Sequence, residues 1–117
     1  MTSFGTFVRG RREELRKDSR AFSVRQVAQR LGVEPAYLSK VERDEVSPPS
    51  EATIVKLAQD LGEDPDVLLA LGGKVPHDLL DAIRKRPRLF ADLIRSLREA
   101  PDHAVLRVVR EIRNGDW

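Results

Sequence analysis

The side chains best suited to chemistry gather on one short predicted helix, residues 35–43. Leu38 and Val41 are three positions apart, which puts one side of this helix into a core. The opposite face carries small and basic side chains, namely Ala36, Ser39, Lys40 and Arg43, with Pro35 and Tyr37 at the entry to the helix. A helix face of this kind suits the major groove of DNA, about 12 Å wide, where bulky acidic side chains would not fit.

The sequence offers little for other kinds of chemistry. It has no cysteine, which excludes disulfides, a thiol nucleophile and thiolate metal sites. His77 and His103 lack the spacing of metal ligands, and Asp78 with Asp81 reads as a helical pair on a solvated face. No glycine-rich phosphate loop precedes a helix. We therefore expect no metal, no cofactor and no enzymatic activity.

A second predicted helix precedes the first and must position it. Ser23 is expected to cap this helix, with Gln26 as its reciprocal partner in a capping box. Gly32 ends it, because glycine adopts the left-handed conformation without steric cost. Its inward face consists of Val24, Val27, Ala28 and Leu31. Ala28 is small, as two helices that cross closely at a steep angle require.

The corner after this helix occurs twice in the chain. Residues 31–35 and 61–65 each contain a last helical leucine, a glycine, an acidic N-cap candidate and a proline at the first helical position. The acidic candidates are Glu34 and Asp64. The pattern predicts two tight helix–helix corners.

Helical periodicity runs through the whole chain, so we predict an all-α protein. Five helices are expected in residues 1–71, the first capped at Thr2-Ser3 and the fourth at Ser50. Gly72-Gly73-Lys74 is the best candidate for a boundary between two parts of the chain. Three further helices are expected in residues 72–117, divided by Pro76, Pro87 and Pro101.

Composition is that of a folded chain, with 40% hydrophobic and 34% charged residues among 117. The formal net charge is +2, but residues 1–30 are strongly basic and residues 31–71 strongly acidic. A basic front of this kind is compatible with a polyanionic partner. The longest apolar run, Val67 to Leu71, is far shorter than the roughly 20 residues of a membrane span. No signal peptide is evident, so we expect a cytoplasmic protein.

Residues 23–43 resemble the helix-turn-helix of the XRE family, the Cro and phage-repressor type of bacterial transcription regulator. The resemblance extends over about residues 4–71. It is carried by a polar cap, a small residue, a turn glycine and a closing motif, which are Ser23, Ala28, Gly32, Leu38-Ser39 and Val41-Glu42-Arg43. It implies a five-helix, lambda-repressor-like domain that binds double-stranded DNA sequence-specifically, with helix 35–43 in the major groove.

The resemblance also implies roles for single residues. Those expected nearest to base edges are Ala36, Tyr37, Ser39 and Lys40. Those expected to hold phosphates are Arg12, Arg25, Gln26, Arg43, Ser47 and Ser50. Arg12 matches an arginine that commonly pairs with the glutamate at the position of Glu42, fixing the angle of the recognition helix. Three positions depart from the family pattern: Val24 replaces a common glutamine, Glu34 a serine or threonine, and Asp44 a glycine.

The C-terminal segment has wide apolar stripes on its last two helices, wider than one neighbour covers. A unit of this size is marginal alone, so we expect it to pack on residues 1–71, on a second copy, or on both. Two-fold related half-sites in DNA favour a dimer. We expect the dimer contacts at Leu89, Phe90, Leu93, Ile94, Leu97, Val105, Val108, Val109 and Ile112. The leading interpretation is a dimeric repressor. Relatives with short helical extensions are often paired with a zinc peptidase or a toxin, which leaves a sensor or antitoxin role open. A helical adaptor that does not bind DNA is a third interpretation.

Overall fold

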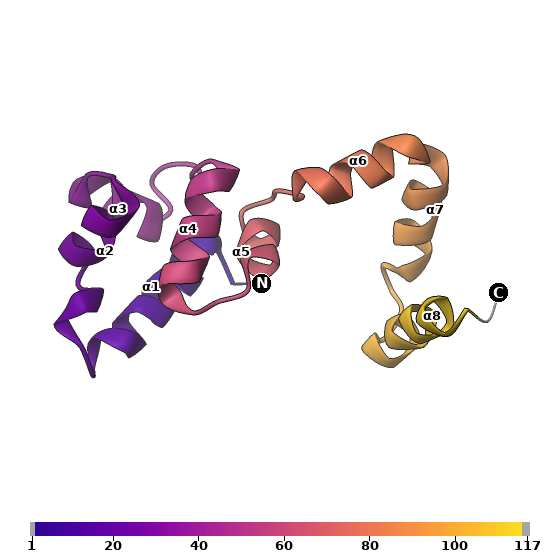
Figure 1. Ribbon diagram of the computed structural model, residues 1–117, viewed down its shortest axis with the longest axis horizontal. Helices are drawn as coiled ribbons and strands as arrows, with labels where there is room; N and C mark the ends of the chain where they lie inside the picture. Colours follow the sequence, from indigo (N-terminus) through magenta and orange to yellow (C-terminus); the bar gives the residue numbers. More distant parts are fainter. Residues whose placement is uncertain (1, 116–117) are drawn as a thin grey trace. The chain divides into compact units, whose positions relative to one another are not determined.

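The computed structural model describes residues 2–115, and all regular structure within them is helical. The chain divides into two compact units, residues 1–76 and 77–117 (Figure 1). The first unit contains α1 (Phe4–Arg16), a 3-10 turn (Arg20–Phe22), α2 (Val24–Leu31), α3 (Pro35–Glu42), α4 (Glu51–Leu61) and α5 (Pro65–Leu71). The second contains α6 (His77–Lys85), α7 (Pro87–Leu97) and α8 (Asp102–Asn114). The all-α prediction of five helices followed by three is confirmed.

Local signals in the sequence set the helix ends of the first unit. The hydroxyl of Ser3 accepts a hydrogen bond from the Thr6 amide at 3.1 Å, which caps α1 as expected. Gly32 ends α2 with φ of 74°, and Gly62 ends α4 with φ of 69°. Both corners therefore form as predicted, each with a left-handed glycine before a proline-initiated helix.

Two capping predictions were wrong in detail. The Ser23 hydroxyl accepts from the Gln26 amide at 3.2 Å, but the Ser23 amide donates to the carbonyl oxygen of Arg20. The preceding 3-10 turn thus uses the group that the capping box would need. Glu34 occupies the N-cap position of α3 without a side-chain hydrogen bond, whereas Asp64 accepts from the Asp66 amide at 2.9 Å. The shorter aspartate reaches the backbone in the way that N-caps require.

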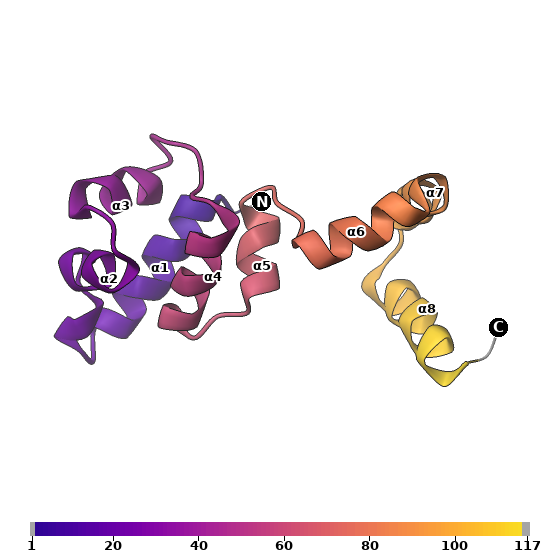
Figure 2. The ribbon, with the colours of Figure 1, turned by 45° about the horizontal axis from the view of Figure 1, so that its top comes forward.

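The core of the first unit lies where its five helices meet. Within the unit, α1 and α4 lie between the α2–α3 pair and α5 (Figures 1 and 2). This arrangement anchors α3 from below while leaving its outer face free. The buried apolar residues are Phe4, Val8, Val27, Ala28, Leu31, Leu38, Val41, Ile54, Leu57, Ala58, Leu61, Leu68 and Leu69.

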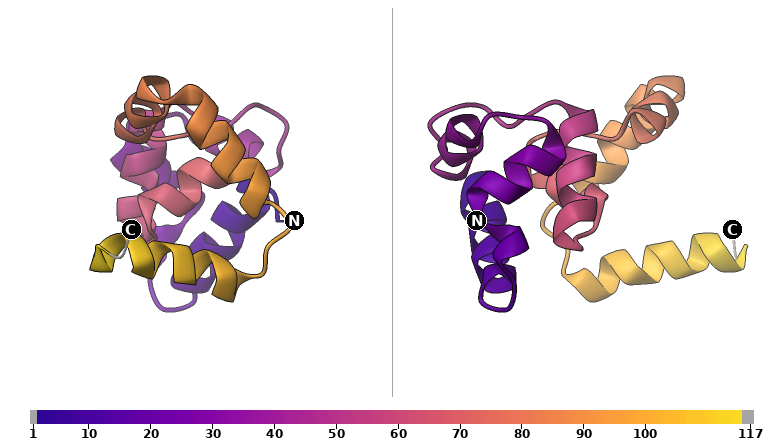
Figure 3. Two further views of the ribbon diagram at one scale, coloured as in Figure 1. Left: turned by 90° about the vertical axis from the view of Figure 1, so that its right-hand side faces the viewer. Right: turned by 60° about the vertical axis from the view of Figure 1, so that its left-hand side comes forward.

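The described part of the second unit, residues 77–115, has well-formed helices but no buried core. Its helices begin at or next to prolines, as expected, and follow one another as three rods (Figure 3). No side chain among residues 77–115 is buried. The separation between units falls after Pro76, five residues beyond the predicted boundary after Leu71. No helix in residues 2–115 combines the length and the apolar character that a membrane crossing requires.

Candidate nucleic-acid interface

The outer face of α3 carries three of the four side chains expected to read bases, Ala36, Ser39 and Lys40, whereas Tyr37 packs against the core. Ala36 and Lys40 are exposed, and Tyr37 and Ser39 are half-buried. On the inner face Leu38 and Val41 are buried in the core. The helix therefore presents small and basic groups outward while its inner face is held in the core. Hydroxyl and ammonium groups on such a face can donate hydrogen bonds to base edges.

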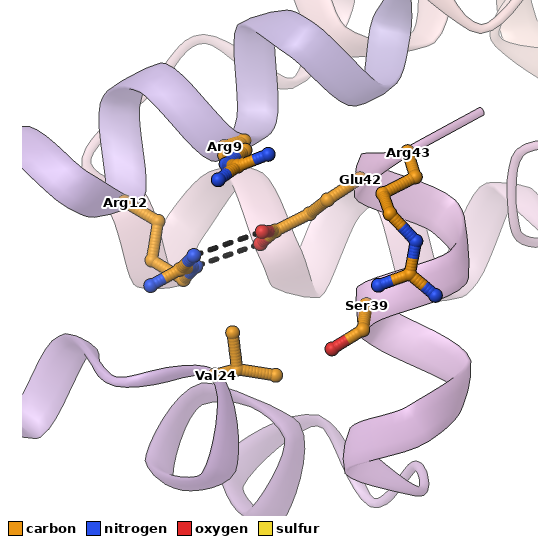
Figure 4. A pocket seen from close by; sticks show the side chains of 6 residues that line it. All are labelled: Arg9, Arg12, Val24, Ser39, Glu42 and Arg43. Atoms are coloured by element: carbon orange, nitrogen blue, oxygen red, sulfur yellow. Dashed lines mark hydrogen bonds and ion pairs between the residues drawn. The ribbon is translucent and has the colours of Figure 1, made fainter.

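An ion pair fixes the C-terminal end of α3 to α1. Arg12 Nε and Nη2 donate to the two carboxylate oxygens of Glu42 at 2.7 and 2.8 Å (Figure 4). Arg12 Nη1 donates to the carbonyl oxygen of Phe22 at 3.2 Å, so the 3-10 turn joins the same network. Both side chains are almost inaccessible, each 4% exposed. The hydrogen bond to Glu42 raises the pKa of Arg12, which keeps the guanidinium charged.

Asp44 makes a second link between α3 and α1. It has φ of 58°, in the left-handed region that aspartate tolerates better than most residues. Its carboxylate accepts from the Ser3 hydroxyl at 2.6 Å and from the Gly5 amide at 3.0 Å, at the start of α1. The departure from the family glycine thus adds a contact, which the sequence did not disclose.

Gly5 permits this close approach. A Cβ at this position would lie 2.6 Å from Asp44 Oδ1 and 2.7 Å from the Glu42 carbonyl oxygen, closer than real Cβ contacts come. Only glycine fits between the start of α1 and the end of α3. The start of α1 therefore holds Asp44, just after α3, and Arg12 farther along α1 holds Glu42 at the end of α3.

A hollow of about 210 Å³ opens beside this network. Its walls come from α1, α2 and the end of α3, and Figure 4 shows the side chains around it. Among the predicted site residues it brings together Arg12, Ser39 and Arg43. It also includes Arg9, which sequence reasoning missed although Arg9 and Arg12 are one helical turn apart on α1. The complete lining is Arg9, Arg12, Val24, Ser39, Glu42 and Arg43.

The other residues expected to hold phosphates lie outside this hollow. Arg25 and Gln26 are exposed in the first turn of α2, and Arg25 lines a separate hollow of about 370 Å³ with Glu34. Ser47 is exposed in the loop between α3 and α4. Ser50 is the N-cap of α4 and accepts a hydrogen bond from the Thr53 amide at 3.4 Å. A phosphate could meet these groups only along a wider surface than the hollow.

The residues expected at a dimer contact all lie on α7 and α8. None is buried within its unit, and Leu89 is 66% exposed. In residues 2–115 no three side chains of histidine, aspartate or glutamate are placed to hold a metal ion.

Comparison with protein families matches residues 13–68 to the family described as helix-turn-helix. The matched segment runs from within α1 to within α5 and includes α2 and α3. No curated protein and no solved structure gives a significant match to the chain.

Proposed function

Because residues 13–68 are a helix-turn-helix domain of the XRE type, a domain of DNA-binding transcriptional regulators, we propose that this protein is a sequence-specific repressor that binds double-stranded DNA as a homodimer. In this proposal α3 enters the major groove. Ala36, Tyr37, Ser39 and Lys40 then contact base edges, where sequence is read.

The observation that carries the proposal is the outer face of α3, which the Arg12–Glu42 pair and Asp44 fix relative to α1. A recognition helix can distinguish bases only if its position on the duplex is constant. Residues that hold phosphates supply this constancy. We assign that role to Arg9 and Arg43 around the hollow, and to Arg25, Gln26, Ser47 and Ser50 outside it. Arg12, which the resemblance also put forward for this role, is 3% exposed and bonded to Glu42 and Phe22, so we assign it the positioning of α3 instead.

The homodimer is supported by the second unit. None of the apolar side chains on α7 and α8 is fully buried among residues 77–115, and Leu89, Ile94 and Ile112 are each more than half exposed. Burying such side chains is worth about 25 cal/mol per Å². A second copy presents the same stripe, so two copies can cover each other around a two-fold axis. Two recognition helices about 34 Å apart then match successive major-groove faces of one duplex.

The same exposed stripes would also serve a different protein. A sensor or antitoxin role, with a regulatory partner bound to α7 and α8, is the second candidate function. Its distinguishing sign is a purified chain that is monomeric alone and forms a stable complex with the product of a neighbouring gene.

The test of the proposed function is genome-wide mapping of the DNA bound by the full chain, followed by titration of the recovered site. We expect a recurrent site with two related halves, bound at least a thousand-fold more tightly than random DNA of the same length. Binding should weaken steeply with salt, because phosphate neutralisation releases counterions. Equal affinity for every sequence would contradict a sequence-specific regulator.

A further inference from the structure

Besides Arg12, two arginines line the hollow, Arg9 and Arg43, and each is already bonded to a carboxylate. Arg43 Nε donates to Glu45 Oε1 at 2.9 Å and Arg43 Nη2 to Glu45 Oε2 at 3.2 Å, a two-point contact. On the facing helix Arg9 Nε donates to Glu13 Oε1 at 3.0 Å. Neither glutamate lines the hollow itself. The positive charge offered to a phosphate at this point is therefore largely balanced within the protein.

These two pairs differ from the Arg12–Glu42 pair in exposure. The side chains of Arg9, Glu13, Arg43 and Glu45 are each about half exposed, between 50% and 55%. Exposed pairs contribute little to stability and exchange partners readily, whereas a buried pair is held by its surroundings. Arg12 thus keeps its pairing with Glu42, whereas Arg9 and Arg43 can exchange their glutamates for another anion.

A carboxylate and a phosphate present similar acceptors to a guanidinium. Both offer two oxygens at the spacing of the guanidinium fork. Glu45 occupies Arg43 with this geometry, and a DNA phosphate would use the same N–H groups. The hydrogen bond from Arg43 lowers the pKa of Glu45, and that from Arg9 lowers the pKa of Glu13. Both glutamates consequently remain charged at neutral pH and compete throughout.

We propose that Glu13 and Glu45 are intramolecular competitors of the DNA backbone, which occupy Arg9 and Arg43 in the free protein and must be displaced when a phosphate enters the hollow. This inference rests on the proposed function and adds a mechanism that sets the affinity of the protein for DNA. Since phosphate contacts carry no base information, the competition lowers affinity for all sequences alike. It limits retention on non-specific DNA and makes binding less dependent on salt.

The consequence for salt follows from counterion release. Each phosphate neutralised by a free arginine contributes about −0.9 to the slope of log K against log salt concentration. When the arginine must first leave a glutamate, the released carboxylate needs a cation of its own, so the net release is smaller. Removing the glutamate charge should restore the full contribution.

The experiment uses the full chain with Glu45→Gln, Glu13→Gln and the control Glu14→Gln. Glu14→Gln removes the same charge from α1 as Glu13→Gln does. Glu14, however, pairs with Arg11, which does not line the hollow. The probe is a fluorescein-labelled duplex of random sequence, about 30 base pairs long and hence several helical turns. Affinity is measured by anisotropy over a series of salt concentrations, and a thermal melt checks that each variant is folded.

We expect Glu45→Gln and Glu13→Gln each to bind about two- to five-fold more tightly than Glu14→Gln, as the loss of an exposed pair allows. Their salt slopes should be steeper by up to about 0.9. The gain in affinity from Glu45→Gln should disappear in an Arg43→Ala background, because Glu45 and a phosphate then have no arginine to compete for.

Two results would overturn the inference while leaving the proposed function intact. One is binding by Glu45→Gln and Glu13→Gln equal to that of Glu14→Gln. The other is an undiminished gain from Glu45→Gln without Arg43, which would show a general charge effect. If the unmodified chain shows no salt-sensitive binding to duplex DNA at all, the proposed function fails and the inference fails with it.

Discussion

Lys40 is the residue on which sequence discrimination should depend most directly. It is exposed on the outer face of α3, where an ammonium can donate to guanine O6 or N7. We predict that Lys40→Ala costs about 1–3 kcal/mol on the recovered site and much less on random DNA. Lys56→Ala, which removes an exposed lysine from α4, is the matched control. Equal losses of Lys40→Ala on both DNAs would assign Lys40 to a phosphate instead.

The Arg12–Glu42 pair should behave as a buried ion pair. Glu42→Ala leaves the Arg12 charge uncompensated in the interior, so we expect the free energy of unfolding to fall by about 3–5 kcal/mol. Glu13→Ala breaks the exposed Arg9–Glu13 pair within α1 and should have little measurable effect on stability. Denaturant unfolding of Arg12→Ala, Glu42→Ala and the double variant measures the coupling. Strictly additive losses would contradict the contact.

Residue types predicted part of this site. Ser39 and Lys40 follow from the helical spacing of Leu38 and Val41, and the Arg12–Glu42 pair follows from a resemblance that the structure supports with two hydrogen bonds. Arg9 was overlooked because nothing in one sequence tells a solvated arginine from one beside a hollow. The role of Asp44 depends on a contact with residues about forty positions earlier, which local patterns do not encode.

At the scale of elements, the junction between α1 and the end of α3 depends on Gly5, one of the two glycines in α1. Gly5→Ala would drive a Cβ into the Asp44 carboxylate and the Glu42 carbonyl, so α3 would have to move. We predict a loss of about 1–3 kcal/mol in the free energy of unfolding, the usual cost of overpacking. DNA affinity should fall as well, since α3 loses its position.

Gly10→Ala is the internal comparison for that prediction. A Cβ at Gly10 meets nothing within 4 Å, and alanine favours a helix interior over glycine by roughly 0.5–1 kcal/mol. This variant should therefore be more stable than the unmodified chain. Thermal melts of the two variants under one condition provide the measurement. Similar behaviour of both would contradict the close packing of α1 against the end of α3.

Helices were the most predictable level of the molecule. Glycines, prolines and polar caps act on their immediate neighbours, so the two corners and the three proline-divided helices could be located from local sequence alone. The capping box at Ser23 formed only half, because its amide joined the 3-10 turn before it. The backbone of the turn thus competes with the Gln26 side chain for the Ser23 amide, which a rule based on two residues does not take into account.

For the whole molecule, the second unit should hold two copies together. Leu93→Glu places a charge in the apolar stripe of α7, where dimer formation would bury it without a partner. We expect a monomer in sedimentation, and operator affinity reduced by orders of magnitude because the two half-sites are no longer linked. Ser96→Glu adds the same charge to the same helix outside the predicted contact set and should remain dimeric. A Leu93→Glu dimer of unchanged affinity would place the interface elsewhere.

The apolar stripes on α7 and α8 call for a covering surface from outside the second unit. Their width indicates that something covers them, and residues 77–115 bury none of these side chains. The identity of the covering surface is a property of an assembly. Sequence periodicity therefore predicts that these helices need a partner.

The most direct test of the account is an amide spectrum of the full isotope-labelled chain titrated with duplex DNA carrying the recovered site. We predict that the largest shifts fall on α3, at Ala36, Tyr37, Ser39 and Lys40, and around the hollow, at Arg9 and Arg43. Signals of the buried core beneath α3 should move little, because this helix is already fixed before DNA arrives. Shifts confined to residues 77–115, with α3 unaffected, would contradict the central claim that this helix reads DNA.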